Sequence, residues 1–158
     1  QHAVGFARAL QHVTWQPSDR GNLDGLRRNL GLASLPNLRD PVTLDIGDAP
    51  WAVKETDHIY AANVVHIAPA SLLEPLFRES ARLLSRGGLL CLYGPYKYGG
   101  KFTTASNERF DGWLRARNPL SGVRDIEVVS ELAQAFGFAA PRDTPMPANN
   151  QLLVFARN

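Results

Sequence analysis

The sequence has little of several features that would narrow its function at once. Its one cysteine, Cys91, excludes an internal disulfide and a zinc site built from cysteines. Cys91 lies in the apolar run LLCLYG, where a buried and unreactive thiol is expected. No apolar run approaches the roughly 20 residues that span a bilayer, and no basic start followed by an apolar core indicates a signal peptide. We therefore expect a cytoplasmic protein that does not act on a membrane.

The chain also lacks a strong excess of charge. Seventeen basic and fifteen acidic residues leave a net charge of +2, which is too small to indicate a nucleic-acid or membrane partner. Arg27 and Arg28 are the only adjacent basic pair, and a solvated helix face explains them. His2, His12 and His58 show no metal-ligand spacing. We expect no metal and no nucleic acid, and nothing indicates an oligomeric state.

What the sequence does contain is an ordinary globular composition. With 44% hydrophobic and 20% charged residues over 158 positions, it predicts one domain covering residues 1–158. A chain of this length can bury about 70% of its unfolded surface without disulfides or metals.

Hydrophobic periodicity predicts helices that alternate with short strands. Helices are expected at residues 1–11, 22–30, from Ser71 to the glycine pair at 87–88, at 107–117 and at 125–136. Strands are expected around Val13 and Trp15, and at residues 42–48, 58–65, 89–94, 142–146 and 152–156. Residues 96–107 have the composition of a loop.

Three local signals refine this scheme. Ser71 and Glu74 have capping-box spacing, and Gly87-Gly88 is a helix stop. The turn residues PANN separate the last two strands, which predicts an antiparallel edge.

The element order predicts an α/β protein with a mostly parallel sheet covered on both faces. Such a sheet requires a strand ahead of the first helix, yet that helix starts at Gln1, and no methionine precedes it. We therefore expect the chain to be a fragment.

Acidic residues stand where predicted strands end. Ligands of open parallel sheets bind outside these carboxyl ends. Asp19 follows the strand around Trp15, and Asp48 with Ala49 follows strand 42–48. Carboxylates suit a ligand with ribose hydroxyls and an exocyclic amine, because both donate hydrogen bonds. A capping role for Asp19 and Asp48 fits equally well.

Specific strings support a family resemblance. The strings YAANVVHIAP, YGPYK, FD–LRARNP–GVRD and MPANN resemble the methyltransferase-like 26 family, also described as domain of unknown function 938. The resemblance covers nearly the whole chain. It implies a Rossmann-like class I methyltransferase sandwich, S-adenosyl-L-methionine as the cofactor, and methyl transfer to a small-molecule acceptor.

The resemblance also implies cofactor contacts. It places Asp19 on the ribose, Asp48 and Ala49 beside the adenine, and Asn63 and Val64 in the segment that flanks the sulfonium. In the family, a strand and a glycine-rich loop directly precede the position of Gln1 and His2, and this loop approaches the methionine part of the cofactor. We expect Gln1 and His2 to face the cofactor, with that first strand and loop missing here.

Candidates for the chemistry follow the next two strands. His66 is the candidate general base, although a structural histidine is the other interpretation. Tyrosines after strand 89–94 would line the acceptor site or cover the core, and asparagines would orient a polar substrate or serve turns. The candidate substrate residues are Tyr93, Tyr96, Asn107, Asn149 and Asn150.

Two other functions fit the sequence. A methyltransferase-like module could bind cofactor or a protein partner without catalysis. A nicotinamide-dependent reductase would use the spacing of Tyr93 and Lys97, but Gly94-Pro95 between them prevents a continuous helix. Methyl transfer remains the main hypothesis.

Overall fold

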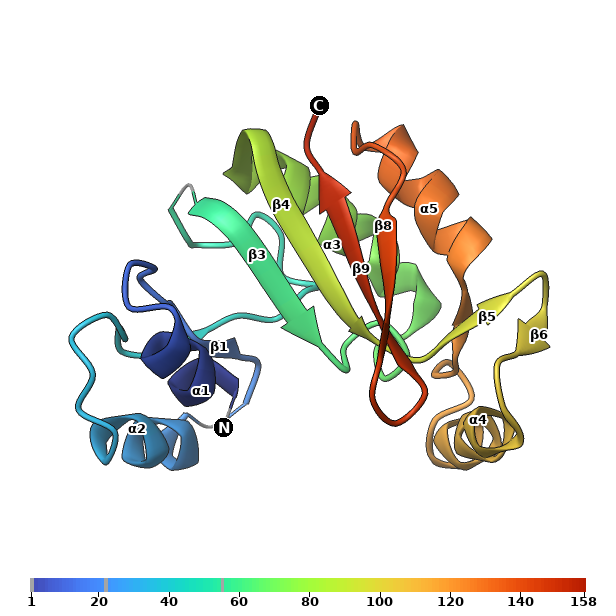
Figure 1. Cartoon of the computed structure of the whole chain (residues 1–158), viewed down its shortest axis with the longest axis horizontal. Helices are drawn as coiled ribbons and strands as arrows, with labels where there is room; N and C mark the ends of the chain where they lie inside the picture. Colours follow the sequence, from blue (N-terminus) through green and yellow to red (C-terminus); the bar gives the residue numbers. More distant parts are fainter. Residues whose placement is uncertain (1, 22, 55) are drawn as a thin grey trace. The chain divides into compact units, whose positions relative to one another are not determined.

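The computed structural model describes residues 2–21, 23–54 and 56–158. The chain divides into two compact units, residues 1–52 and residues 53–158, and each is described by itself (Figure 1). The single domain over residues 1–158 stays a prediction. No helix in the described ranges is long and apolar enough to cross a membrane.

The first unit has two helices and a minimal parallel sheet. Its elements are α1 (His2–Ala9), β1 (Ser18–Asp19), α2 (Asp24–Gly31) and β2 (Val42–Thr43). On α1 the ring of Phe6 stacks on Trp15 at 5.1 Å between centroids, and Ala7 is buried. Among the described residues, a helix is found in each of the two places where one was predicted, although α1 ends two residues earlier than expected; Gln1 and Asn22 lie outside the described residues.

The strands of this unit are shorter than predicted. Trp15 makes only an isolated parallel bridge with Leu38, and regular pairing starts at Ser18, because Pro17 between them has no N–H to donate. Asp19 therefore lies within β1 and not beyond it. β2 ends early because the Asp45 carboxylate accepts a hydrogen bond from the Gly47 N–H at 2.9 Å, which turns the chain.

The second unit contains a four-stranded mixed sheet in the order β3-β4-β9-β8. Its strands are β3 (Thr56–Ala62), β4 (Leu84–Gly94), β8 (Arg142–Met146) and β9 (Asn150–Ala156). β3 and β4 are parallel, whereas β9 is antiparallel to both β4 and β8. The predicted antiparallel C-terminal edge is confirmed.

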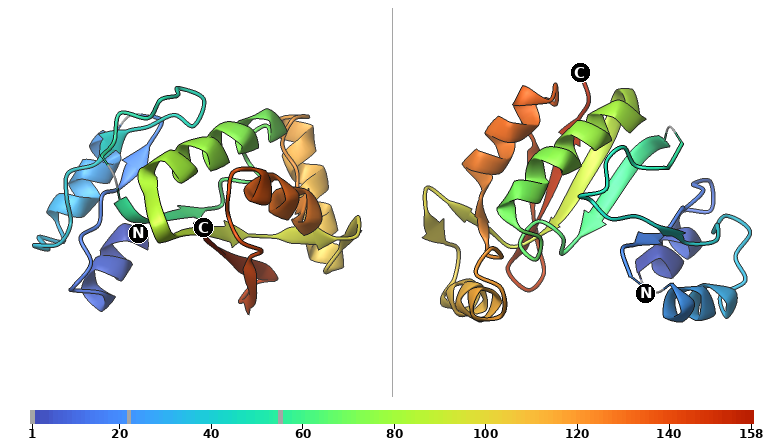
Figure 2. Two further views of the ribbon diagram at one scale, coloured as in Figure 1. Left: turned by 90° about the horizontal axis from the view of Figure 1, so that it is seen from above. Right: turned by 180° about the vertical axis from the view of Figure 1, so that it is seen from behind.

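Two helices cover one face of this sheet, as Figure 1 and Figure 2 show. They are α3 (Leu73–Leu83), preceded by the short 3-10 turn η1 (Ala70–Leu72), and α5 (Ile126–Ala135). Between helices and sheet, the rings of Phe77, Phe138 and Phe155 meet edge to face at 5.7–6.5 Å. These rings join the fully buried Leu90 and Leu92 of β4 in one core.

The start of α3 and its junction with β4 differ from the predictions. Leu72 is the N-cap residue and makes no side-chain capping bond, while Glu74 pairs with Arg78 at 3.2 Å, so the predicted capping box is wrong. The glycine pair does not end the helix either. The helix ends at Leu83 and Gly87-Gly88 lie inside β4, where the pairing with β3 slips.

A glycine pair suits this slip for two reasons. Gly87 has φ +84°, and a Cβ on Gly88 would lie 2.8 Å from the carbonyl oxygen of Asp57.

The segment predicted as loop 96–107 forms a hairpin. It consists of β5 (Tyr96–Tyr98) and β6 (Lys101–Phe102), joined at Gly99 and Gly100, which both have positive φ. β5 also pairs in parallel with β7 (Arg124–Asp125). Helix α4 (Ala105–Arg117) follows the hairpin and is capped by the Thr104 side chain, which accepts from the Asn107 N–H. The helices predicted at 107–117 and 125–136 are confirmed.

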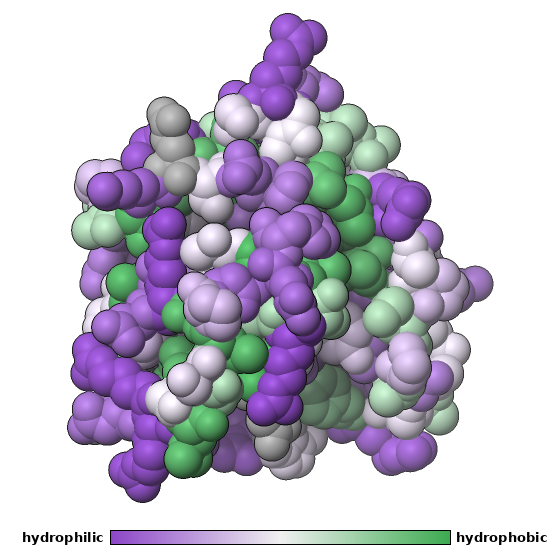
Figure 3. All heavy atoms as spheres, turned by 60° about the vertical axis from the view of Figure 1, so that its left-hand side comes forward, coloured by the Kyte–Doolittle hydropathy of each residue, from purple (hydrophilic) through white to green (hydrophobic). Residues whose placement is uncertain are grey.

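Surface hydrophobicity is dispersed on the face that Figure 3 draws, where hydrophobic side chains lie in several places among hydrophilic ones. Large exposed apolar side chains occur in both units: Leu10, Leu32, Ile67, Trp113, Leu120 and Val128.

Candidate functional site

The parallel strands β3 and β4 bring their carboxyl ends together. Asn63, directly after β3, adopts the left-handed conformation with φ +58°, and its N–H donates to the Tyr93 carbonyl at 2.8 Å. This turn ends β3 at Ala62, three residues before the predicted end at Val65. In the second unit, Asn63 and Val64 therefore lie at the sheet edge where a ligand is expected.

His66 packs against the end of β4. Its side chain is 2% exposed, and the Phe110 ring meets the imidazole edge to face at 5.5 Å. A Cβ on Gly94 would lie 2.9 Å from Nδ1 of His66, so only glycine permits this approach. Burial, and secondarily the nearby Arg124 guanidinium, lowers the pKa of His66 to about 4. The imidazole is neutral at pH 7 and shielded from water, which suits the structural interpretation; the general-base role stays a prediction.

The loop that carries His66 is anchored by a residue that the sequence did not single out. The guanidinium of Arg124 donates to the carbonyl oxygens of Val65 (3.3 Å), Ala68 (2.8 Å) and Leu120 (2.8 Å). These bonds join the loop after β3 to the loop after α4. The string GVRD contained Arg124, but no periodicity indicated its partners.

A buried carboxylate supports the same loop from α4. Asp111 is 8% exposed and accepts from the Val123 N–H and from Nε of Arg115, both at 2.7 Å. Gly122 has φ +150°, and its N–H donates to the His66 carbonyl at 2.9 Å. The spacing of Asp111 and Arg115, an acid and an arginine at positions i and i+4 of a helix, was the one sequence signal for this anchor.

Four predicted substrate residues come together beside this loop. Nδ2 of Asn150 donates to the Tyr93 hydroxyl at 3.1 Å, and Nδ2 of Asn107 donates to the Asn149 carbonyl at 2.9 Å. Asn107, although in the first turn of α4, thereby contacts the turn between β8 and β9. We call Tyr93, Asn107, Asn149 and Asn150 the amide cluster.

Tyr96, the fifth predicted substrate residue, is separate from the amide cluster. It is 1% exposed, and burial raises the pKa of its hydroxyl. The structure thus places Tyr96 in the interior. This position fits the interpretation that the tyrosine covers the hydrophobic core. Neighbouring Tyr98 donates to Asp143 at 2.5 Å.

Lys97 forms an ion pair with Asp125, whereas a reductase would need Lys97 beside Tyr93. Its Nζ pairs with the Asp125 carboxylate at 3.1 Å, whereas Tyr93 bonds with Asn150. Tyr93 and Lys97 also lie on different strands, β4 and β5. These contacts argue against the reductase hypothesis.

The remaining predicted cofactor residues belong to the first unit. The carboxylate of Asp19 is exposed and accepts from the Gly21 N–H at 3.1 Å. Asp48 and Ala49 are exposed in the segment after β2, and His2 is the exposed first residue of α1. Gln1 lies outside the described residues.

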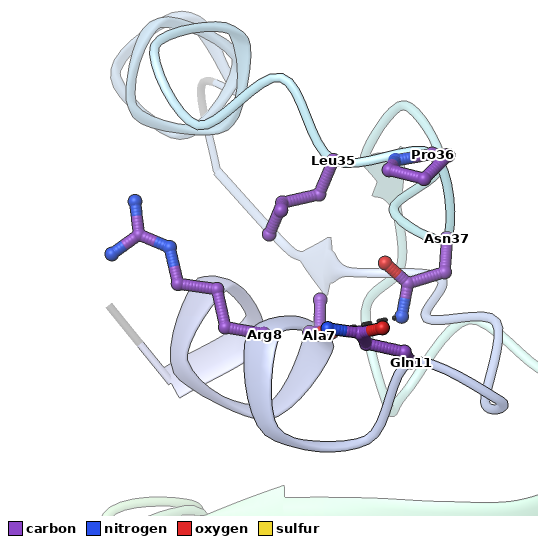
Figure 4. A pocket seen from close by; sticks show the side chains of 6 residues that line it. All are labelled: Ala7, Arg8, Gln11, Leu35, Pro36 and Asn37. Carbon is purple, nitrogen blue, oxygen red and sulfur yellow. Dashed lines mark hydrogen bonds between the residues drawn. The ribbon is translucent and has the colours of Figure 1, made fainter.

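The first unit also contains an open pocket of about 400 Å³ that no predicted site residue lines (Figure 4). It lies between α1 and the segment after α2, and its lining residues are Ala7, Arg8, Gln11, Leu35, Pro36 and Asn37. The Asn37 amide donates to the carbonyls of Ala7, Leu10 and Val13 at 2.9–3.1 Å. Asn37 therefore has a structural role at the end of α1.

Within the described ranges, no three His, Cys, Asp or Glu side chains gather as metal ligands would.

A family model described as "Protein of unknown function (DUF938)" matches residues 1–157. The chain belongs to the DUF938 family. The methyltransferase-like 26 description of this family stays a prediction.

Solved structures similar to this DUF938 chain share one fold. The S-adenosylmethionine-dependent methyltransferase SibL in its apo form has a TM-score of 0.82 at 19% identity, over 98% of this chain and 46% of its own. An O-methyltransferase family protein from Burkholderia thailandensis has a TM-score of 0.85 at 16% identity, over 98% of this chain and 47% of its own. Human N-acetylserotonin methyltransferase in complex with SAM has a TM-score of 0.73 at 13% identity, over 96% of this chain and 43% of its own.

These similarities show that the chain has the α/β fold of class I S-adenosylmethionine-dependent methyltransferases. The predicted α/β methyltransferase fold is confirmed, but the four-stranded sheet of the second unit is mixed and not mostly parallel, since only its β3–β4 pair is parallel. The chain spans less than half the length of each of these three structures.

Proposed function

We propose that this protein binds S-adenosyl-L-methionine and takes part in methyl transfer to a small-molecule acceptor. The observation that carries the proposal is the methyltransferase fold over nearly the whole chain. The amide cluster supports it, because polar side chains gather at a strand end where this fold class binds ligands.

Asp19 suits the ribose of the cofactor. Its carboxylate is exposed and accepts one hydrogen bond from Gly21, so it keeps lone pairs for two ribose hydroxyls. We assign Asp48 and Ala49 to the adenine, Gln1 and His2 to the methionine part, and Asn63 and Val64 to the sulfonium.

The residues around the loop after β3 would act by positioning. When bound, the cofactor would supply an activated methyl group: the acceptor's lone pair would bond to the methyl carbon while the carbon–sulfur bond breaks and S-adenosylhomocysteine leaves. The protein then contributes mainly orientation. A neutral His66, packed under Phe110 and against Gly94, shapes this loop. We therefore assign proton removal from the acceptor to solvent in preference to His66.

Calorimetric titration of the full-length natural protein with S-adenosylhomocysteine tests the proposal. We expect saturable one-to-one binding below millimolar ligand. Absence of binding at millimolar ligand would refute cofactor use. Binding without transfer of labelled methyl to any compound of a small-molecule extract would instead favour a non-catalytic cofactor-binding module.

A further inference from the structure

The amide cluster has a defined set of unused hydrogen-bonding groups. Nδ2 of Asn107 faces the Asn149 carbonyl and the Thr103 hydroxyl, both at 2.9 Å. A carbonyl oxygen only accepts, so this side of the Asn107 amide is its NH₂ group. Its Oδ1 therefore points away from these partners.

The same argument orients Asn150. Its Nδ2 donates to the carbonyl oxygens of Pro147 (3.2 Å) and Ala148 (3.3 Å) and to the Tyr93 hydroxyl (3.1 Å). Two of these partners can only accept, which identifies the NH₂ side. Because the Tyr93 oxygen accepts from Asn150, its own hydrogen is directed elsewhere.

The unused groups are mostly acceptors. In residues 56–158, no hydrogen bond is made to Oδ1 of Asn107, Asn149 or Asn150, while Nδ2 of Asn149 donates to the Ser106 hydroxyl at 3.1 Å. Three amide oxygens, one phenolic hydrogen and the second N–H of Asn149 thus remain for a ligand. None of the four side chains is a carboxylate or a cationic group.

We propose that the amide cluster binds an uncharged O–H or N–H group of the methyl acceptor. A carboxylate or phosphate would meet three amide oxygens and only two donors, neither of them charged, so such an anion is disfavoured. A cation would lose its hydration without gaining a carboxylate partner. A neutral hydroxyl or amine donates to an amide oxygen and can accept from Tyr93, which satisfies both partners.

The position of the cluster agrees with this assignment, which rests on the proposed function. Tyr93 precedes Gly94, which contacts His66, and the Tyr93 carbonyl accepts from the N–H of Asn63. The amide cluster therefore adjoins the segment that we assign to the sulfonium of the cofactor.

The experiment uses the full-length ¹⁵N-labelled protein with saturating S-adenosylhomocysteine. 4-Methylphenol and 4-methylbenzoate are titrated separately, and the side-chain amide resonances of Asn107, Asn149 and Asn150 are followed by NMR. We expect saturable shifts with the phenol at millimolar concentration and none with the benzoate. No shifts with the phenol, or equal shifts with both probes, would overturn the proposal.

A hydroxyl deletion separates binding at the cluster from cofactor binding. Tyr93→Phe should weaken phenol binding about five- to tenfold and leave the affinity for S-adenosylhomocysteine unchanged. Tyr98→Phe is the matched control, because its hydroxyl bonds with Asp143 outside the cluster. Equal phenol affinity of wild type and Tyr93→Phe would overturn the proposal. If the wild type did not bind S-adenosylhomocysteine at all, that result would count against the proposed function alone.

Discussion

Gly94 occupies the point where β4 passes the imidazole of His66. A Cβ there would lie 2.9 Å from Nδ1 and 3.1 Å from Cε1 of a ring that is also held by Phe110. Gly94→Ala should therefore lower the free energy of unfolding by about 1–3 kcal/mol, since the ring must leave its position. Urea denaturation measures the change.

Gly112 provides the matched control for this substitution. It lies on α4 with nothing within 4 Å of an added Cβ. Gly112→Ala should raise the free energy of unfolding by about 0.5–1 kcal/mol, because alanine loses less backbone entropy in a helix. If both variants changed stability alike, the close packing at His66 would be disproved.

The burial of His66 also predicts a pH dependence. Its pKa in the folded protein is about 4, below the ordinary value of 6.5. As the pH falls through 6.5, the unfolded chain binds the proton first. The free energy of unfolding is therefore highest above pH 6.5 and decreases toward pH 4, by about 2 kcal/mol between about pH 7.5 and pH 5.

Comparison with His66→Gln isolates this contribution, because glutamine does not titrate while the other groups of the chain do. The stability difference between wild type and variant should shrink by about 2 kcal/mol on acidification over this range. Urea denaturation at both pH values gives the difference. Parallel pH profiles for the two proteins would contradict the lowered pKa.

At the scale of elements, Arg124 should control the order of the loop after β3. The N–H groups of Ile67 and Ala68 donate to the Val64 carbonyl, and Arg124 holds the carbonyls of Val65 and Ala68. Arg124→Met removes the bonds from the guanidinium to the carbonyls of Val65 and Ala68. Amide hydrogen exchange at Ile67 and Ala68 should accelerate on the order of tenfold, while Leu90 in β4 is unaffected.

An exposed arginine serves as the control for Arg124. Arg78 forms a solvent-exposed pair with Glu74 on α3, and such pairs contribute little. Arg78→Met should leave exchange at Ile67 and Ala68 unchanged. Unchanged exchange at both residues in Arg124→Met would show that other contacts hold the loop.

The sequence predicted which elements exist better than where they end. The helices α3 and α5 carried clear apolar periodicity, α4 carried little, and all three were found. The glycine pair at 87–88 led to a wrong prediction of where α3 ends, because a helix stop and a bulge inside a strand have the same local composition. The hairpin after Pro95 was missed because β6 has two residues and no hydrophobic alternation.

At the scale of the whole molecule, alternation of helices and strands was sufficient to predict an α/β protein, and the family resemblance narrowed this to the methyltransferase fold. The site was less predictable. Strand ends located Asn63 and Tyr93, but the bond from the Val123 N–H to Asp111 and the bond from Arg124 to the Ala68 carbonyl join residues more than ten positions apart. Such bonds have no signal in local spacing. Burial likewise distinguishes Tyr96 from Tyr93, and the sequence alone could not separate them.

Ligand binding provides a whole-molecule test of the Asp19 assignment, because a ligand that binds only the folded state raises the melting temperature of the protein. Asp19→Ala should weaken S-adenosylhomocysteine binding by roughly 1–3 kcal/mol, since the ribose hydroxyls lose their acceptor. At equal ligand concentration, the thermal shift of the full-length variant should be clearly smaller than that of the wild type. Asp40→Ala, which removes another exposed acid of the first unit, is the control and should keep the full shift. An undiminished shift in Asp19→Ala would place the ribose elsewhere.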